Sequence, residues 1–438
     1  MGSYIPSTPA ERLEMLKAIG LNDFKDLYRD VPASMYLDKP LNIPEGMSEL
    51  EVSRAMSEMA AKNTMFNTIL RGAGAYDHYI PSIVKYIPAK EEFLTAYTPY
   101  QAEMSQGVLQ SIFEYQTMIC ELTGMDVSNA SVYDGATAAA ESVAMCVERK
   151  KTKAYISATV NPAYLDVVKT YCYGSGVPLT IIPEKDGKTD PEALKAALSS
   201  DAACFISQQP NFYGLMEDCE ALAGATHEAG AKYVMICNPI SLGICKTPSE
   251  YGADVAVGEG QPLGMPLAFG GPYLGFMATK SQMARKLPGR IVGQTVDKEG
   301  KRGFVLTLQA REQHIRREKA SSNICSNQAL CALTASVYLS AMGKKGLSQA
   351  ATLCVSKAHY FADLLSQIDG IELVYQGEFF HEFLTTLPKA DEVLAELESE
   401  GILGGYPTEK GVLWCVTEVV TKAELDRAAK IIKEVLAR

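Results

Sequence analysis

The segment from Tyr133 to Thr137 has residue types that could hold a phosphate group. Its sequence, Tyr-Asp-Gly-Ala-Thr, leads directly into an alanine-rich stretch that we expect to form a helix from Ala136 to about Lys151. The N–H groups at the positive end of such a helix, together with the Thr137 hydroxyl, are suited to an anion. The same residues are equally explained by Asp134 as a helix N-cap and Gly135 as a site of close packing. The segment alone leaves both interpretations open.

Amide side chains follow three of the predicted strands at the points where those strands end. Asn211 lies in the Gln-Gln-Pro-Asn-Phe-Tyr-Gly segment after the third strand, Asn238 follows the fourth, and Gln261 follows the fifth. Carboxyl ends of parallel strands share one edge of a sheet, so we expect these amides close to one another. An amide forms hydrogen bonds but supplies neither the amine of a Schiff base nor a negative charge.

The elements that would position these residues alternate between short apolar runs and helical patterns. Such alternation predicts a parallel sheet covered by helices on both faces. The predicted strands are 154–157, 177–182, 203–207, 233–237, 255–257 and 274–278, with helices at 191–198 and 219–229 between them. Farther on we predict a long helix from about Asn327, strands at 371–375, 380–385 and 412–416, and helices at 390–400 and from Lys422.

These patterns divide the chain into three parts. Residues 1–75 are predicted as a helical N-terminal arm, in which Thr8 caps a helix over residues 8–19. Residues 76–326 form the large α/β domain, and residues 327–438 form the long helix and a small C-terminal α+β domain. A further apolar helix is predicted over 108–124, ending at Gly124.

Composition excludes some classes of partner. The formal net charge of −11 and pI near 5.2 argue against nucleic acid, and no apolar run is long enough for a membrane span. Residues 280–319 nevertheless hold eleven Lys and Arg against four acids. This stretch is either a solvated face with helix ion pairs or a docking patch for an acidic partner, a carboxylate or a phosphate. The eleven cysteines have no Cys-x-x-Cys pair and the N-terminus has no targeting pattern, so we expect no metal site and a cytoplasmic location.

Five motifs carry a resemblance to a known family. They are Gly-Ala-Gly-Ala-Tyr-Asp-His-Tyr-Ile-Pro at 72–81, Tyr-Thr-Pro-Tyr-Gln at 97–101, the segment 116–126, Gly-Gln-Thr-Val-Asp at 293–297 and the segment 308–319. From about Tyr4 to its end the chain resembles the P-protein of the glycine cleavage system. Its length is similar to that of the first of the two subunits into which this protein is split in many prokaryotes.

The resemblance implies the fold of a pyridoxal-phosphate (PLP) transferase of the aminotransferase type, fold type I. It implies that Gln261 stands in place of the cofactor lysine, Asn238 in place of the acid that pairs with the ring nitrogen, and Asn161 near the ring-stacking position. Asp134, Gly135, Thr137 and Asn211 would complete a vestigial pocket. PLP would then be bound covalently by a second, beta subunit, and the pair, as an α2β2 heterotetramer, would decarboxylate glycine and pass the aminomethyl group to the lipoyl H-protein.

Sites in this fold lie between two protomers, so Tyr97, Thr98, Tyr100, Gln101 and His78 are expected to contribute from across the interface. Ordinary loop packing of the tyrosines, and a structural histidine beside Asp77, are the alternatives. The sequence leaves two other hypotheses about the function of the whole chain open. One is an enzyme competent alone, with Lys246 or Lys280 serving the cofactor, and the other is a catalytically silent regulatory or scaffold subunit.

Overall fold

The central sheet has apolar side chains on both of its faces. In strand β8 (Lys232–Cys237), Tyr233 and Met235 pack into one core cluster while Val234 and Ile236 pack into a second. The computed structural model describes residues 6–37, 39 and 41–438, so Tyr4 and Pro40 of the predicted arm lie outside the described residues. Successive side chains of a strand point to opposite faces, so a strand that is apolar throughout must be covered on both sides.

The sheet has seven strands and is mainly parallel, as the sequence predicts. The order is β2-β10-β9-β8-β7-β3-β4. Adjacent strands from β9 to β4 run parallel, and β10 pairs antiparallel with both β9 and β2. The strands other than β8 are β2 (Val127–Ser128), β3 (Lys153–Ser157), β4 (Leu179–Ile182), β7 (Ala202–Gln209), β9 (Val255–Glu259) and β10 (Gly275–Thr279).

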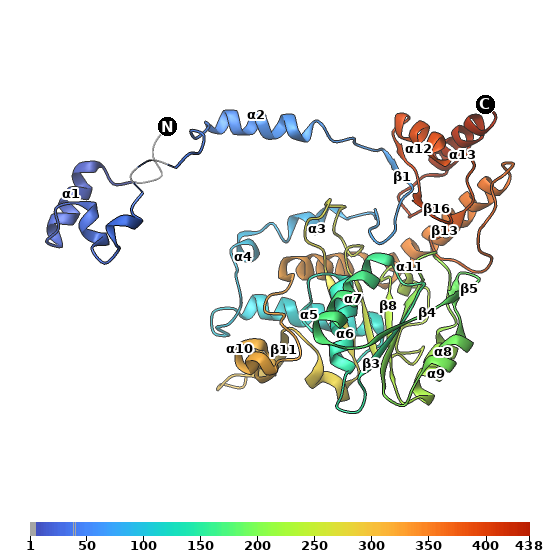
Figure 1. The fold of residues 1–438 in the computed structure, drawn as a ribbon, viewed down its shortest axis with the longest axis horizontal. Coiled ribbons are helices and arrows are strands. Elements are labelled where there is room, and N and C mark those ends of the chain that lie inside the picture. Colours follow the sequence, from blue (N-terminus) through green and yellow to red (C-terminus); the bar gives the residue numbers. More distant parts are fainter. Residues whose placement is uncertain (1–5, 38, 40) are drawn as a thin grey trace. The chain divides into compact units, whose positions relative to one another are not determined.

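Helices cover both faces of this sheet (Figure 1). One core cluster joins the sheet to α5 (Gln106–Thr123), α8 (Pro191–Ala197), α9 (Cys219–Glu228) and the first half of α11 (Ala329–Ser366). The other joins it to α6 (Gly135–Cys146) and α7 (Pro162–Ser175). Helix α6 is shorter than predicted because Val147 turns to an extended conformation.

The C-terminal part has its own core around the fully buried Trp414. Strands β13 (Glu382–Thr385), β16 (Gly411–Cys415) and β15 (Tyr406–Thr408) form an antiparallel sheet that packs with α12 (Ala390–Ser399), α13 (Lys422–Leu436) and the second half of α11. The strand predicted at 371–375 is wrong: only an isolated bridge from Leu373 to Thr385 forms there. Gly370 and Gly377, both with positive φ, turn the chain on either side of it.

Several short elements complete the main body. A hairpin of β11 (Ile291–Val296) and β12 (Arg302–Thr307), which the sequence pattern did not predict, packs against α5. The remaining elements are α3 (Ser82–Tyr86), α4 (Glu91–Leu94), β5 (Glu184–Lys185), β6 (Lys188–Thr189), η3 (Ser241–Gly243), η4 (Ser281–Lys286), η5 (Gln309–Arg311), α10 (Gln313–Arg316), η6 (Arg317–Lys319) and β14 (Ile402–Leu403).

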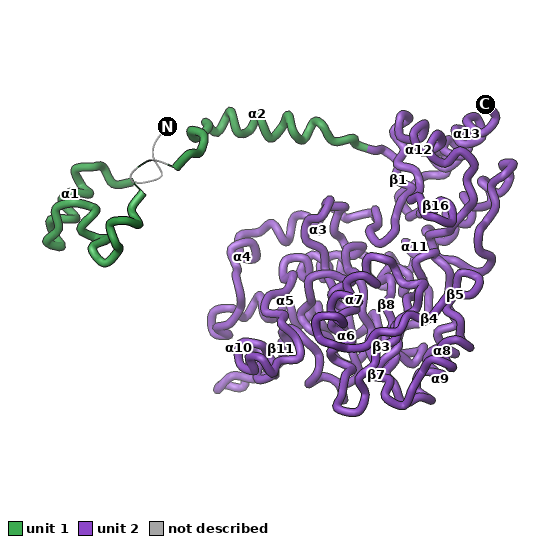
Figure 2. The backbone as a smooth tube through the Cα atoms, viewed as in Figure 1, with its two compact units in different colours: residues 1–65 green, residues 66–438 purple. Residues whose placement is uncertain are grey.

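The chain separates into two compact units, residues 1–65 and 66–438 (Figure 2). The first holds α1 (Pro9–Ala18), η1 (Phe24–Tyr28), η2 (Ala33–Met35) and α2 (Glu49–Ala60), and Thr8 caps α1 as predicted. Residues 66–75, which we assigned to the arm, belong to the second unit, because β1 (Thr68–Ile69) pairs in parallel with β14. Among the described residues, none of the helices is both long enough and apolar enough to span a membrane.

Candidate active site

Three strands of the sheet end at a small cavity. Gln208, Asn238 and Glu259 line it from the ends of β7, β8 and β9, and Asn161 and Tyr164 line it from the start of α7. Gly74 and Tyr76 close it from the N-terminal side. This is the carboxyl edge of the parallel strands, where α/β folds of this type place their ligand sites.

Gln261 uses its whole amide group in structural contacts. Its Oε1 accepts a hydrogen bond from the Tyr76 N–H at 2.9 Å, and its Nε2 donates to the Tyr76 and Met265 carbonyls, each at 2.8 Å. The side chain is 1% exposed. A buried amide with all these partners is an internal clamp that holds the Tyr76 backbone against the end of β9.

A carboxylate of this chain lies at the N-terminus of α6. The sequence suggested either a phosphate site or an ordinary helix cap at this position. Glu259 Oε2 accepts from the Gly135 N–H at 2.9 Å, and Glu259 Oε1 accepts from the N–H groups of Gln261 and Leu274, also at 2.9 Å. Asp134 caps α6 by accepting from the Thr137 N–H at 2.7 Å. The N–H groups of Gly135 and Thr137 are therefore already bonded to acidic side chains of this chain. Burial raises the pKa of Glu259 to about 7, although its three N–H partners favour the charged form.

The residues present do not fit PLP. The cavity has a volume of about 30 Å³, close to the space that one water molecule needs, whereas small-molecule sites span about 300–1,000 Å³. Gly135 shows how tightly this edge is packed: a Cβ atom there would lie 2.1 Å from the Tyr164 hydroxyl. With Glu259 on the helix end and no amine at position 261, the site lacks both the space and the chemistry for the cofactor.

The other predicted pocket residues have defined partners. Asn161 caps α7 by accepting from Ala163 N–H and donates from Nδ2 to the Ala73 carbonyl at 3.0 Å. Asn238 accepts from the Ile240 N–H and lies 3.3 Å from His381 Nε2. Asn211 does not line the cavity, because it is bonded to Glu217 and to the loop around Gly187.

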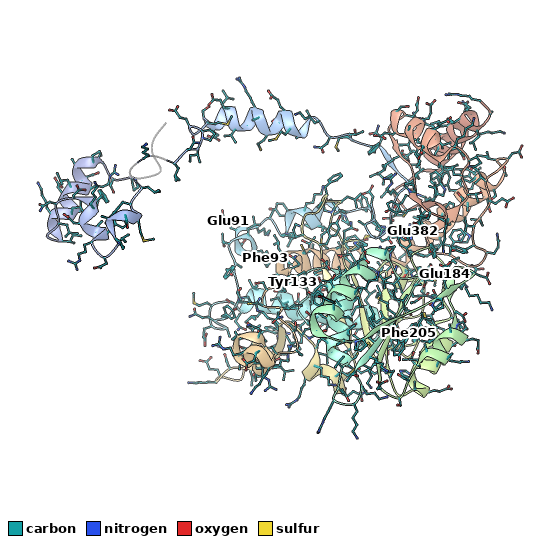
Figure 3. The ribbon with its side chains drawn as sticks, viewed as in Figure 1. Glu91, Phe93, Tyr133, Glu184, Phe205 and Glu382 are labelled. Carbon is teal, nitrogen blue, oxygen red and sulfur yellow. The ribbon has the colours of Figure 1, made fainter. Side chains whose placement is uncertain are left out.

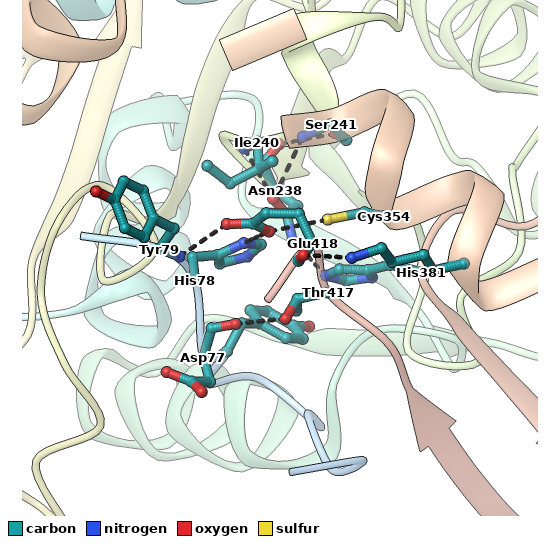
Figure 4. A network of polar contacts seen from close by, with 12 residues as sticks. Asp77, His78, Tyr79, Asn238, Ile240, Ser241, Cys354, His381, Thr417 and Glu418 are labelled. Carbon is teal, nitrogen blue, oxygen red and sulfur yellow. Dashed lines mark hydrogen bonds and ion pairs between the residues drawn. The ribbon is translucent and has the colours of Figure 1, made fainter. Parts of the chain in front are cut away.

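A buried polar network adjoins the clamp (Figure 4). Glu418 Oε2 lies 2.7 Å from His78 Nδ1, while Glu418 Oε1 accepts from the Tyr79 N–H at 2.8 Å. Burial of Glu418 opposes its ionisation, but the hydrogen bond and charge of His78 lower its pKa to about 2. His78 is thus a buried hydrogen-bond partner of Glu418, 5% exposed, and not a side chain that projects from the surface.

Glu382, which Figure 3 labels, is another buried carboxyl of this region. It accepts from the Ala73 N–H at 2.7 Å and from the Tyr76 hydroxyl at 2.8 Å. Burial raises its pKa to about 7, against the effect of these two hydrogen bonds. The Glu259, Glu382 and Glu418 carboxyls were missed from the sequence. Of the three, only Glu259 could have been found from the sequence, because it is an acidic residue at the end of an otherwise apolar strand.

The loop between α4 and α5 carries the other predicted contributors. Tyr97 is 89% exposed and Tyr100 is 58% exposed, while Thr98 is half-buried and Gln101 is exposed. Two exposed tyrosines in one short loop leave a large apolar and hydroxyl-bearing surface without cover in this chain.

The two lysines considered for a self-sufficient enzyme are engaged elsewhere. Lys246 pairs with Glu220, and Lys280 Nζ lies 3.3 Å from Asp254 Oδ1. Neither residue lines the cavity. The geometry therefore gives no support to a Schiff base on this chain.

Curated relatives share about half of their sequence with this chain. The protein from Moorella thermoacetica named probable glycine dehydrogenase (decarboxylating) subunit 1 is 51% identical, over 99% of this chain and 100% of its own length. The protein of the same name from Carboxydothermus hydrogenoformans is 50% identical, over 98% and 99% of the two chains.

Solved structures show the same fold. A crystal structure of glycine decarboxylase (P-protein) of the glycine cleavage system, in inhibitor-bound form, superposes with a TM-score of 0.93 at 42% identity, over 99% of this chain and 100% of that chain. Sphingosine-1-phosphate lyase from Burkholderia pseudomallei, at 13% identity, shares the fold with a TM-score of 0.67 over 92% and 94% of the two chains. An alanine–glyoxylate aminotransferase from Nostoc, at 15% identity, has a TM-score of 0.59 over 92% and 98%.

The fold type I architecture of a PLP-dependent enzyme is thus confirmed, and with it the resemblance read from the motifs. The profile of the family described as Glycine cleavage system P-protein matches residues 2–432. Together with the full-length relatives, this match shows that the chain belongs to the glycine cleavage system P-protein family.

Proposed function

We propose that this chain is the first subunit of a two-subunit glycine dehydrogenase (aminomethyl-transferring, decarboxylating). The observation that carries the proposal is Gln261, which occupies the end of β9 with every group of its amide bonded to the protein. A chain of this family without a cofactor amine needs a partner that has one. The names of the relatives, which specify a subunit 1, support the existence of a second subunit.

In this proposal the second subunit binds PLP through its lysine and the cofactor supplies the decarboxylation chemistry. This chain forms part of the wall of the shared site. Tyr97, Thr98, Tyr100 and Gln101 face the partner, because their loop leaves two tyrosines uncovered. His78 contributes indirectly, since Glu418 bonds both its ring and the N–H of Tyr79, an exposed residue.

The assembled enzyme would accept glycine as substrate and pass the aminomethyl group to the lipoyl arm of the H-protein. An α2β2 assembly fits a fold whose sites lie between protomers. The cationic stretch 280–319 is suited to an acidic partner such as the H-protein. All eleven cysteines are unpaired, which supports a reducing compartment, the cytoplasm.

The test is glycine-dependent exchange of CO2, with PLP and H-protein present, for this chain alone, for the second subunit alone and for their mixture. Activity confined to the mixture is the expected result. Exchange catalysed by this chain alone would overturn the proposal and return attention to Lys246 and Lys280.

A silent scaffold subunit of the same fold predicts a different response to mutation. In the mixture, Tyr97→Ala and Tyr100→Ala would then leave the exchange rate almost unchanged. We expect instead a fall of about tenfold or more in at least one of them, since a misplaced wall of a site costs rate through positioning. Gel filtration of each mixture checks that the subunits still associate.

A further inference from the structure

Arg290 is a buried cation without an acidic partner. It lies just before β11, which Figure 1 shows beside α5, and it is 6% exposed. Within the described part of the chain, no Asp or Glu oxygen lies within 4.0 Å of its guanidinium. A buried charge that nothing neutralises is costly, so an arrangement of this kind suggests an anion that the chain alone does not hold.

The hydrogen-bond partners of Arg290 are neutral. Nη1 donates to Asn327 Oδ1 at 3.3 Å, Nη2 donates to the Tyr100 hydroxyl at 3.1 Å, and the buried Nε has no partner among the described residues. Arg311 lies close by and donates to the carbonyls of Leu287 and Gly289, the latter at 2.6 Å. The hydrogen bonds that the Arg290 guanidinium makes therefore go to neutral groups alone.

Tyr100 connects this buried charge to the surface. Its ring centroid is 5.3 Å from Arg290 Cζ, so the guanidinium also interacts with the aromatic face. Because the Tyr100 oxygen accepts from Arg290, its own proton must point to a different acceptor. A hydroxyl that accepts from a cation is a stronger donor, and Tyr100 is 58% exposed. The result is an exposed donor held in place by a buried charge.

We propose that Arg290 is a positioning residue that holds the Tyr100 hydroxyl as a hydrogen-bond donor to an oxyanion in the site shared with the second subunit. The oxyanion is either the phosphate of the cofactor or the carboxylate of glycine, which offer the same acceptor chemistry. This inference rests on the proposed function, because both anions reach Tyr100 only when a partner holds them.

The test uses the complex of this chain with its second subunit. Tyr100→Phe keeps the ring and removes the donor, Arg290→Met removes the charge at similar length, and the double variant combines them. The matched control is Arg149→Met, since Arg149 is an exposed arginine outside the stretch 280–319. Two quantities are measured: the dissociation constant of PLP from the complex, followed by absorbance, and KM and kcat for glycine.

Each single variant is expected to raise either the PLP dissociation constant or KM for glycine by about tenfold. This is the size of effect expected from the loss of one charge-assisted hydrogen bond. A rise in the PLP dissociation constant identifies the cofactor phosphate, and a rise in KM for glycine at constant PLP affinity identifies the substrate carboxylate. The double variant should be no worse than the worse single variant, because Arg290 acts through Tyr100. Arg290→Lys should recover part of the loss.

Multiplicative losses in the double variant would overturn the inference, as would an Arg290→Met effect confined to thermal stability or subunit association. An active wild-type pair with unaffected variants would remove this inference and leave the proposed function standing. An inactive wild-type pair would remove both. Because Tyr100 is exposed, Tyr100→Phe is expected to fold, so the comparison does not depend on Arg290→Met alone.

Discussion

At the scale of single residues, Gln261, at the position where we expected the family's cofactor lysine, is bonded to the protein through every group of its amide. Gln261 accepts one hydrogen bond and donates two, a combination that no lysine could reproduce, since an ammonium group has donors and no acceptor. Glu259 meanwhile bonds the Gly135 N–H at the end of α6. This edge of the sheet is therefore packed protein, held by contacts of both Gln261 and Glu259.

This leads to a prediction for Gln261→Lys. The variant should not form an imine with added PLP, because the cavity of about 30 Å³ and the Glu259 carboxylate leave no room for the cofactor. It should also lower the free energy of unfolding by about 2–4 kcal/mol, because Tyr76 N–H loses its acceptor and a cation is buried. Visible absorbance after dialysis and a chemical denaturation curve measure the two effects.

Gln376→Lys serves as the control for Gln261→Lys, since Gln376 is exposed. It is expected to change stability by less than about 0.5 kcal/mol. A dialysis-resistant imine band in Gln261→Lys would show that the pocket can open, and would contradict the assignment of Glu259 and Gln261 as a packed structural pair.

At the scale of elements, the segment 66–79 joins the C-terminal domain to the edge of the central sheet. Arg71 donates to the carbonyls of Gly404 and Gly405 at 3.0 and 2.9 Å, next to the pairing of β1 with β14. Farther along the segment, Tyr76 and His78 bond to Glu382 and Glu418. A single stretch of chain therefore fixes both the clamp at Gln261 and the buried acids of the small domain.

Arg71→Ala should loosen this attachment. Two hydrogen bonds to carbonyl groups are lost, at a cost of about 1–3 kcal/mol, and the amides of β1 and β14 should exchange with solvent faster. Hydrogen exchange measured by mass spectrometry over residues 66–72 and 400–405 provides the readout. Arg149→Ala, at an exposed arginine, should leave the exchange unchanged. Equal exchange in the two variants would show that β1 pairing does not depend on Arg71.

The elements that could be predicted from the sequence are those with a simple apolar period. The strands at 203–207 and 233–237 were predicted because they are apolar on both faces, and helix α5 because it ends at Gly124 in the left-handed conformation. The hairpin of β11 and β12 was missed because its outer half is exposed and polar. The apolar residues at 371–375 suggested a strand. Turns on both sides of this segment leave only the isolated bridge from Leu373 to Thr385.

The candidate site could be predicted from the sequence only in part. Gln261 and Asn238 are visible in the sequence because they follow strands, whereas their partners come from distant parts of the chain. Tyr76 meets Gln261 across 185 positions, and Arg290 meets Tyr100 across 190. Contacts of this separation depend on how the elements pack, which no local pattern encodes.

At the scale of the whole molecule, buried carboxyl groups should make stability depend on pH. Burial raises the pKa of Glu141, Glu259 and Glu382 to about 7 in each case, from an ordinary value of 4.5. Between those values the folded protein binds more protons than the unfolded chain, so the free energy of unfolding should fall as pH rises from about 4.5 to 7. His381, whose pKa burial lowers well below 6.5, acts in the opposite direction below that pH.

The three glutamates together have a larger effect than His381. We therefore expect the free energy of unfolding to fall by about 2–5 kcal/mol between pH 4.5 and 7, with little further change from these groups above pH 7. Glu418 titrates outside this window, because its pKa of about 2 places its loss of stabilisation in stronger acid.

Denaturant midpoints measured at half-unit pH steps give the curve of stability against pH. In Glu382→Gln the fall should be smaller, because the amide oxygen can still accept from the Ala73 N–H and the amide has no charge to bury, while Glu398→Gln, at an exposed position, should follow the wild type. A Glu382→Gln curve parallel to the wild type would show that Glu382 does not change its protonation across this range.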